Sequence, residues 1–187
     1  SCDWWKQSGA DDLTIDEMRA LAQSLPSLGT RVVVFSGGEP LLRPEVFDAA
    51  DAFLEQDIAL HLLTSGVLLE RFADRVARRF SRVCVSLDAS TDALYERIRG
   101  VNALATVARG VARLRREAPD VPVTGRATLH RVNFRELPRL IDHAKAIGLD
   151  AISFLPADVS SRAFGRETAP DAGTLALTAD EVSEFAA

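Results

Sequence analysis

The segment VVVFSGGEP, residues 32–40, determines how the rest of the sequence is interpreted. Its four leading apolar residues predict a strand covered on both faces, as in parallel sheets. The strand runs directly into Gly37 and Gly38, and paired glycines allow a ligand to approach the backbone closely. Glu39 adds a carboxylate suited to an ammonium group, and Pro40 stiffens the exit from the turn. An ordinary strand-to-helix turn accounts for the glycines but not for the acid, so we predict a binding site here.

Short apolar runs predict strands along the chain, and amphipathic segments between them predict helices. The expected strands are Arg31–Phe35, Ala59–Thr64, Arg82–Leu87, Val121–Leu129 and Ala151–Leu155. The expected helices are Ile15–Leu25, Pro44–Gln56, Leu68–Phe80, Ala103–Glu117 and Phe134–Ile147. Thr14 with Glu17, and Thr178 with Glu181, stand at the capping-box spacing that begins a helix. The alternation predicts a parallel α/β sheet, either doubly wound or part of a (β/α) barrel.

Polar residues follow consecutive expected strands, at the edge where parallel α/β folds bind ligands. The second strand runs into Thr64-Ser65-Gly66, and the third runs into Ser86-Leu87-Asp88. Ser86 and Asp88 share one side of their strand because side chains alternate with period two. Such residues are also common in plain turns. Their succession at neighbouring strand ends favours a site for a polar small molecule that carries a ribose or an amino acid group.

The composition indicates an ordinary globular chain, and we treat residues 1–187 as a single domain. It is 47% apolar, and its net charge of -5 and pI near 5.2 argue against a nucleic-acid partner. One group of arginines fits the solvent-facing side of a helix: Arg75, Arg78, Arg79 and Arg82. No apolar run approaches the ~20 residues of a membrane span, and no leader peptide opens the sequence. Two cysteines, Cys2 and Cys84, are too few for a disulfide framework, so we expect a cytoplasmic, reducing compartment.

The order of the motifs resembles the radical S-adenosylmethionine (radical SAM) superfamily. The resemblance rests on Cys2-Asp3-Trp4-Trp5-Lys6, Ser36–Leu42, Thr64–Gly66, Val85–Asp88 and Arg97–Gly100, and it extends through Ile152–Pro156. It implies a partial (β/α)6 TIM-like barrel that is best matched over residues 1–156. Residues 157–187 would begin a further C-terminal segment. The first strand and part of the cluster-binding loop would precede Ser1.

The resemblance also implies a binding site for S-adenosylmethionine (SAM). Gly37, Gly38 and Glu39, followed by Pro40, resemble the motif that holds the amino group of the methionine moiety. Other positions would contact the ribose or carboxylate, line the pocket or support the adenine through the backbone. They are Ser65, Ser86, Asp88, Arg126, Thr128, Phe154 and Leu155.

Family members carry three cysteines spaced C-x-x-x-C-x-x-C, whose thiolates hold a [4Fe–4S] cluster. Cys2 resembles the third of these cysteines and is therefore an implied metal ligand, whereas Cys84 in mid-strand is interpreted as a buried apolar residue. The implied chemistry is reductive cleavage of SAM, with electrons from an external donor, to a 5′-deoxyadenosyl radical. That radical abstracts hydrogen from a small-molecule or peptide substrate. One cysteine cannot hold the cluster, so we expect the 187 residues alone to be inactive.

Two alternatives to this enzyme stay open. A degenerate relative without a cluster would bind SAM or a partner protein but perform no chemistry; cysteines three and seven residues before Cys2 would favour the enzyme. An aldolase- or isomerase-type barrel would place a lysine or a phosphate-binding loop at a strand end. Lys6 and Lys145 fall elsewhere, which argues against that class.

Several charged and titratable residues have ambiguous roles in the sequence. His61 within a strand and His143 within a helix are assigned structural roles. His130 follows a strand, where it either faces the substrate or begins a loop. Arg97 and Arg99 lie in a loop-like stretch, where the plain interpretation is ion pairing with Asp92 or Glu96, worth about 0–1 kcal/mol if exposed.

Overall fold

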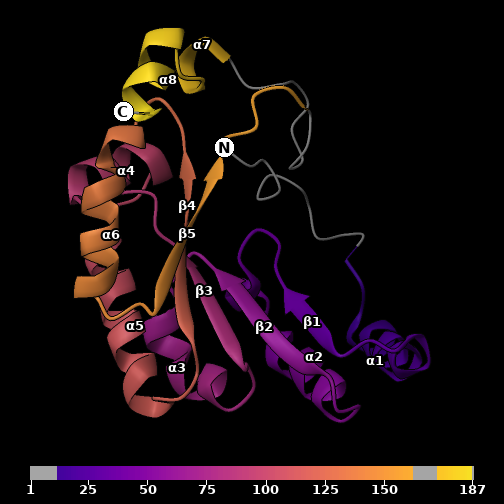
Figure 1. Cartoon of the computed structure of the whole chain (residues 1–187). Coiled ribbons are helices and arrows are strands. Elements are labelled where there is room, and N and C mark those ends of the chain that lie inside the picture. Colours follow the sequence, from indigo (N-terminus) through magenta and orange to yellow (C-terminus); the bar gives the residue numbers. More distant parts are fainter. Residues whose placement is uncertain (1–11, 162–171, 187) are drawn as a thin grey trace.

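The computed structural model describes residues 12–161 and 172–186 (Figure 1). The strands are β1 (Val32–Phe35), β2 (Ala59–Thr64), β3 (Arg82–Ser86), β4 (Val123–Leu129) and β5 (Ala151–Pro156). The helices are α1 (Ile15–Ser24), α2 (Val46–Leu54), α3 (Leu69–Ala77), α4 (Asp92–Arg99), α5 (Leu104–Glu117), α6 (Leu137–Ala146), α7 (Ala172–Leu175) and α8 (Ala179–Ala186). Short 3₁₀ turns are η3 (Leu25–Leu28), η4 (Pro40–Leu42) and η5 (Phe134–Glu136).

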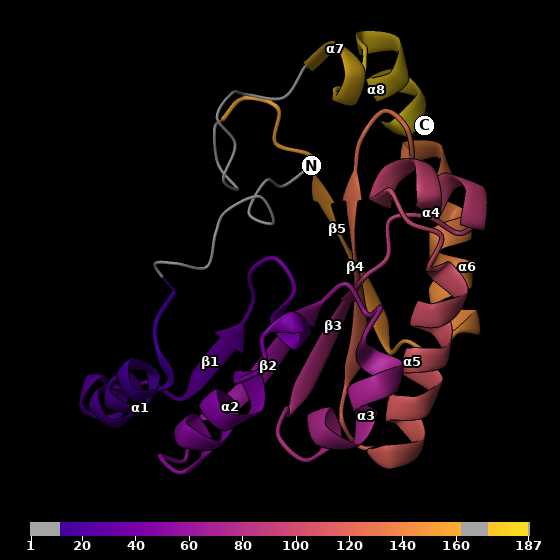
Figure 2. The same cartoon turned by 180° about the vertical axis from the view of Figure 1, so that it is seen from behind.

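The strands form one parallel sheet in the order β1-β2-β3-β4-β5. Each strand therefore lies beside its neighbour in sequence, and the order never reverses as it does in a doubly wound sheet. Figures 1 and 2 show α3, α5 and α6 together against the same side of the sheet. This arrangement is the winding of a (β/α) barrel and confirms the predicted class, a partial parallel-stranded TIM-like barrel.

The two faces of the sheet differ in burial. In β2 the side chains alternate between buried and half-buried, with Leu60 and Leu62 fully covered by helices. Phe35 anchors this covered face through edge-to-face contacts with Phe53 and Phe80, with ring centroids 5.8 and 5.5 Å apart. Burial of such large apolar side chains is the main force that holds helices on this face.

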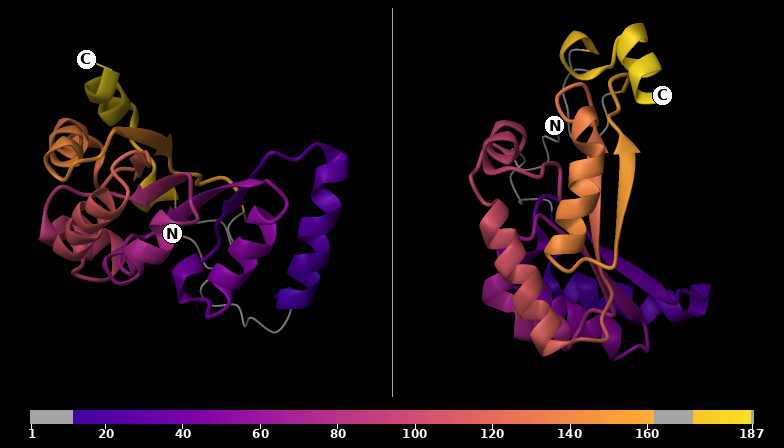
Figure 3. Two further views of the ribbon diagram at one scale, coloured as in Figure 1. Left: turned by 90° about the horizontal axis from the view of Figure 1, so that it is seen from below. Right: turned by 60° about the vertical axis from the view of Figure 1, so that its left-hand side comes forward.

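The opposite side of the sheet, here called the inner face, is lined by the alternate strand residues. Its members are Val32, Val34, Ala59, His61, Leu63, Arg82, Cys84, Ser86, Thr124, Arg126, Thr128, Ala151, Ser153 and Leu155. Within the described part of the chain no helix packs on this face, and Val34 is 50% exposed. Figure 3 shows α5 and α6 on only one side of β4 and β5. The inner face is therefore open for a ligand or for further polypeptide.

Two capping boxes begin helices, as predicted. The Thr14 hydroxyl accepts the Glu17 backbone N–H at 3.3 Å, and the Glu17 carboxylate accepts the Thr14 N–H at 2.8 Å. Thr178 and Glu181 repeat the arrangement at 3.3 and 2.9 Å before α8. Both boxes satisfy backbone donors that the first turn of a helix leaves without partners.

The stretch that was expected to be loop-like is the helix α4. Thr91 caps its start by accepting the Leu94 N–H, and Gly100 ends it in the left-handed conformation at φ 76°. The predicted pairing of Arg99 with Asp92 or Glu96 is also wrong, because Arg99 reaches back to Asp88. The helix has only eight residues, and its bounds are set by Thr91 and Gly100 rather than by a long apolar stripe, so it is hard to recognise in the sequence.

The expected arginine-rich helix face is only partly correct. Arg75 stacks on the Phe47 ring at 3.9 Å, and Arg79 forms an ion pair with Asp51. Arg82, however, is the first residue of β3, because the helix has already ended at Ala77. Its side chain belongs to the inner face of the sheet.

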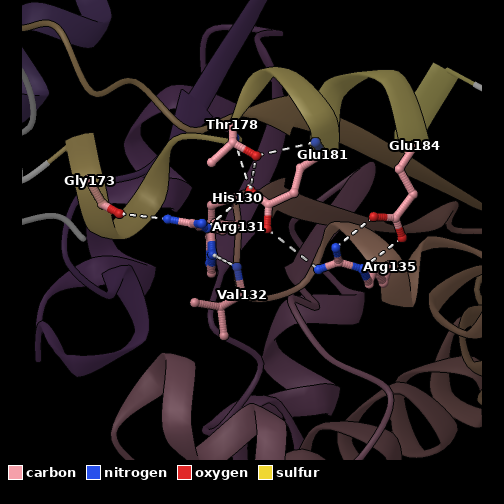
Figure 4. A network of polar contacts seen from close by, with 8 residues as sticks. All are labelled: His130, Arg131, Val132, Arg135, Gly173, Thr178, Glu181 and Glu184. Carbon is pink, nitrogen blue, oxygen red and sulfur yellow. Dashed lines mark hydrogen bonds and ion pairs between the residues drawn. The ribbon is translucent and has the colours of Figure 1, made fainter.

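The C-terminal helices contact the loop that follows β4 (Figure 4). Arg131 pairs with Glu181 at 3.0 Å, and Arg135 pairs with Glu184 at 2.6 Å. Phe134 packs edge-to-face on Phe185 with centroids 6.2 Å apart. These contacts attach residues 172–186 to the same end of the sheet that carries the strand-end residues. No helix in the described ranges is long and apolar enough to cross a bilayer.

Candidate functional site

The carboxylate of Glu39 connects the ends of β1 and β2. One oxygen accepts the Thr64 hydroxyl at 2.7 Å and the Leu41 N–H at 3.2 Å. The other oxygen accepts the Ser65 backbone N–H at 2.7 Å and the Ser65 hydroxyl. The Thr64 hydroxyl is itself fixed, because it accepts the Gly66 N–H at 3.0 Å. Glu39 therefore points inward along the strand ends and places its negative charge there.

The glycine turn beside Glu39 leaves space over the backbone. Gly37 has φ 133°, a conformation that side-chain-bearing residues rarely adopt, and a Cβ on it would meet nothing within 4 Å. Ser36, Gly37 and Gly38 are all exposed. Pro40 begins η4, and its neighbour Leu41 is buried, so the exit of the turn is anchored in the core. The exposed peptide groups of this turn leave the space that a closely approaching ligand would need.

Asp88 connects the ends of β3 and β4 in a similar way. Its carboxylate accepts the Thr128 backbone N–H at 2.7 Å and the Arg99 guanidinium at 3.0 Å. The aspartate side chain is only 6% exposed, whereas that of Arg99 is 29% exposed. Because an isolated buried charge is unfavourable, the guanidinium of Arg99 serves as the counter-ion of Asp88 at this edge.

A buried asparagine fixes the loop after β4. The Asn133 amide donates to the carbonyls of Asp88 and Thr128 at 2.9 and 3.0 Å, and its oxygen accepts the His130 N–H at 2.9 Å. Asn133 is fully buried. This single side chain ties together the Asp88 strand end, the end of β4 and the loop that begins at His130.

His130 is buried beside this asparagine. Its Nδ1 accepts the Val132 N–H at 3.2 Å, so the neutral ring carries its proton on Nε2. Burial lowers the pKa of His130, and the nearby charge of Asp88 opposes that shift. The arrangement favours the loop interpretation of His130, since one ring nitrogen is used to hold the loop itself.

The remaining predicted SAM-site residues lie on two sides of the sheet. Ser86, half-buried, and the exposed Arg126 are register partners on the inner face, and Thr128 follows on the same side. Leu155 is 46% exposed on this face. Phe154 instead points to the helix-covered side and packs against the core, so only its backbone is available to a ligand on the inner face.

The predicted metal ligand, Cys2, lies outside the described residues. Among the described residues no three His, Cys, Asp or Glu side chains gather in a way that could hold a metal ion. Cys84 is 8% exposed, in line with its interpretation as a small buried residue.

The sequence does not reveal the roles of four side chains at this edge of the sheet. In the sequence, Thr64 is visible only as part of a polar turn, Arg99 has nearby acids as expected partners, and Asn133 has no predicted role. Tyr95 was also overlooked: its hydroxyl is fully buried and makes no hydrogen bond within the described structure. Burial raises the pKa of Tyr95, and the neighbouring Arg99 lowers it. The polar loop after β4 is the one available signal for Asn133, which lies four residues beyond the end of that strand.

These features define a class of protein: a (β/α) barrel type with polar side chains gathered at the carboxyl ends of neighbouring parallel strands, the edge where such folds bind ligands. The sequence model of the Radical SAM superfamily matches residues 2–144. The chain belongs to the radical SAM superfamily, whose members are enzymes that use SAM and a [4Fe–4S] cluster.

Curated relatives act on chemically different substrates, as their names state. A PqqA peptide cyclase from Rhodopseudomonas palustris is 32% identical over 78% of this chain and 39% of its own length. A probable GTP 3',8-cyclase from Methanocaldococcus jannaschii is 28% identical over 91% of this chain and 58% of its own. An AdoMet-dependent heme synthase from Methanosarcina barkeri is 30% identical over 74% of this chain and 40% of its own length. The chain thus spans about half the length of the curated relatives that it matches.

Solved structures share the fold. Native anSMEcpe with bound AdoMet and the Cp18Cys peptide superposes with a TM-score of 0.69, at 16% identity over 99% of this chain and 53% of that one. Coproporphyrinogen III oxidase (HemN) from Escherichia coli superposes with a TM-score of 0.72, at 9% identity over 97% of this chain and 45% of that one. At these identities the superpositions support the architecture alone.

Proposed function

We propose that the protein reductively cleaves SAM and uses the product radical to abstract hydrogen from a small-molecule or peptide substrate. The main observation that supports this proposal is the preorganised edge of the sheet, where hydrogen bonds fix Glu39 and Asp88 and the Gly37 turn is open. When bound, a [4Fe–4S] cluster and SAM together supply a 5′-deoxyadenosyl radical, with electrons from an external donor. A cytoplasmic location suits this chemistry, because thiolate ligands persist in a reducing compartment.

The turn at residues 37–40 holds the methionine end of SAM in this proposal. A carboxylate offers about four lone-pair sites, and the donors on Glu39 occupy a similar number. Glu39 therefore supplies negative charge beside the ammonium group and fixes the turn through Ser65. The open carbonyls of Gly37 and Gly38 accept the hydrogen bonds of the ammonium, and Pro40 keeps the turn in place.

The ribose and the carboxylate of SAM would lie over β3 and β4. Asp88 retains acceptor capacity beyond the Thr128 N–H and the Arg99 guanidinium, which suits the ribose hydroxyls. Ser86 and Arg126 face the same space from register-paired positions, and the guanidinium suits a carboxylate. The β5 backbone at Phe154 and Leu155 would support the adenine.

Cys2 would be one thiolate ligand of the cluster. The substrate class follows from the relatives only in outline, because those named above include a peptide cyclase and a GTP cyclase. Streptococcus suis SuiB, solved with its precursor peptide SuiA, superposes with a TM-score of 0.67 at 14% identity over 91% of this chain and 39% of that one. A peptide or a small molecule therefore remains the proposed substrate.

The test is anaerobic reconstitution of the full-length protein with iron and sulfide, followed by SAM binding measured by calorimetry. We expect about four irons per chain, a thiolate-to-iron absorption band and SAM binding that requires the cluster. A Cys2→Ala variant should lose the band, whereas Cys84→Ala should retain it because Cys84 is a buried strand residue. Cluster-independent SAM binding with no iron uptake would instead establish a non-catalytic binding module.

A further inference from the structure

The inner face of the sheet carries two arginines without an acidic partner among the described residues. Several arginines elsewhere in the chain pair with carboxylates, as Arg79 does with Asp51 at 2.7 Å. Arg126 donates to the Ser153 hydroxyl at 3.4 Å, and Arg82 makes no ion pair within the described ranges. The five strands themselves contain no Asp or Glu. The two guanidinium charges are thus left available on a face that is open to a ligand.

Both arginines line a single pocket on this face. His61 lies beside Arg82 in the strand register, and Thr124 lies beside Cys84. Val34 supplies an apolar wall from β1. The pocket therefore combines cationic and hydrogen-bonding groups with apolar surface, and it lacks the negative charge that would repel an anion.

The pocket extends away from the strand ends where SAM is proposed to bind. Arg126 is the register partner of Ser86, and Arg82 lies four residues before Ser86 on the same strand. At a rise of about 3.3 Å per residue, the backbone of Arg82 lies about 13 Å from that of Ser86 at the strand end. A molecule whose reacting carbon lies near the strand ends would reach Arg82 only with an extended body.

We propose that Arg82, with its register partner His61, binds the anionic end of an elongated substrate that carries a phosphate or carboxylate group. Guanidinium groups bind both groups through paired, charge-assisted hydrogen bonds. The net charge of the whole chain is -5, so general electrostatic attraction does not bring anions to it, and recognition must come from this local basic site. The inference rests on the proposed function, whose substrate class it specifies.

The test is calorimetric titration of the full-length protein at low ionic strength with two probes, inorganic tripolyphosphate and tricarballylate. We expect at least one probe to bind, and the stronger one identifies the phosphate or the carboxylate as the preferred group. Arg82→Gln should weaken binding at least about tenfold, because it removes a charge-assisted contact. Arg116→Gln is the matched control: Arg116 is exposed on α5, on the covered side of the sheet, and its loss should change affinity less than about twofold.

The proposal is overturned if neither probe binds. It is also overturned if Arg116→Gln and Arg82→Gln lose the same amount of affinity for the probe. Circular dichroism verifies that each variant is folded, and Arg82→Lys, which keeps the charge but not the fork, replaces Arg82→Gln if that variant fails to fold. Arg82→Lys should lose less affinity than Arg82→Gln would. If Arg82→Lys loses no affinity at all, the proposal is overturned. Probe binding does not require SAM cleavage, so failure of this site and failure of the proposed function give different results.

Discussion

Glu39 and Ser65 lie on turns after different strands, yet the Ser65 backbone N–H donates to the Glu39 carboxylate at 2.7 Å. The register places Phe35 of β1 beside Leu62 of β2, so the two turns begin at the same edge of the sheet. Because the acid is fixed by the neighbouring turn, its charge is in position before a ligand binds. Preorganisation of this kind reduces the entropy lost on binding.

Replacement of Glu39 by glutamine should weaken both the fold and the SAM site. The amide nitrogen cannot accept hydrogen bonds, so one pair of donors, such as those of Ser65, would face another donor. We expect a loss of about 1–3 kcal/mol in the free energy of unfolding and at least about tenfold in SAM affinity. Urea denaturation and calorimetry measure the two effects. Glu45→Gln, at an exposed position nearby, should leave both unchanged, and an equal effect there would refute a special role for Glu39.

Substitution of Gly37 by alanine separates backbone strain from ligand contact. At φ 133° alanine is strained, at a cost of about 1–3 kcal/mol, although its Cβ would meet nothing within 4 Å. Gly29→Ala is the control, because Gly29 has φ 75°, also has open space around it and lies far from the strand ends. Both variants should lower the melting temperature, but only Gly37→Ala should lower SAM affinity. Equal SAM binding by the two variants would remove residue 37 from the site.

A double-mutant cycle should show that Asp88 and Arg99 act as a pair. Asp88→Asn removes the partner of the guanidinium, and Arg99→Gln leaves a buried carboxylate without its counter-ion. Each single change should cost about 2 kcal/mol in the free energy of unfolding, and the double change should cost about 1 kcal/mol less than their sum. Additive losses would show that the ion pair does not support the β3 end.

Lowering the pH should destabilise the protein through two histidines, the buried His130 and the half-buried His143. Burial lowers the pKa of His130 and of His143 from the ordinary value of 6.5. Near pH 6.5 the unfolded chain therefore binds more protons than the folded chain. The free energy of unfolding is highest above pH 6.5, and it falls as the pH drops from 6.5 toward the pKa of the histidines in the folded protein. Urea denaturation at pH 7.5, 6.5 and 5.5 measures this slope. The His130→Gln/His143→Gln variant should show a clearly smaller slope over that window; an unchanged slope would assign it to other groups.

The fold follows from the sequence where the pattern is local and apolar. The run at 32–35 and the strand Ala59–Thr64 are continuous or alternating apolar segments, and both were predicted within a residue of their ends. The helix Asp92–Arg99 was missed because its start and end depend on Thr91 and Gly100 rather than on hydrophobic periodicity. Local polar signals with a known geometry, such as the capping boxes, were equally reliable.

The site follows from the sequence only in part. The Gly-Gly-Glu-Pro turn is visible because an acid between glycine and proline is unusual in an ordinary turn. The partners of the acids are not visible, because Thr128 lies 40 residues from Asp88, and Asn133 lies 45 residues from it. Which residues meet across the sheet depends on strand register, which hydrophobic patterns alone do not specify. The available charge of Arg82 is hidden for the same reason.

The central claim is that the strand-end site holds SAM for reductive cleavage. The most direct measurement is anaerobic incubation of the reconstituted full-length protein with SAM and dithionite, with 5′-deoxyadenosine quantified by mass spectrometry. The account predicts 5′-deoxyadenosine from the native protein and none above background from Cys2→Ala. Failure of the cluster-loaded native protein to form 5′-deoxyadenosine, while still binding SAM, would contradict it.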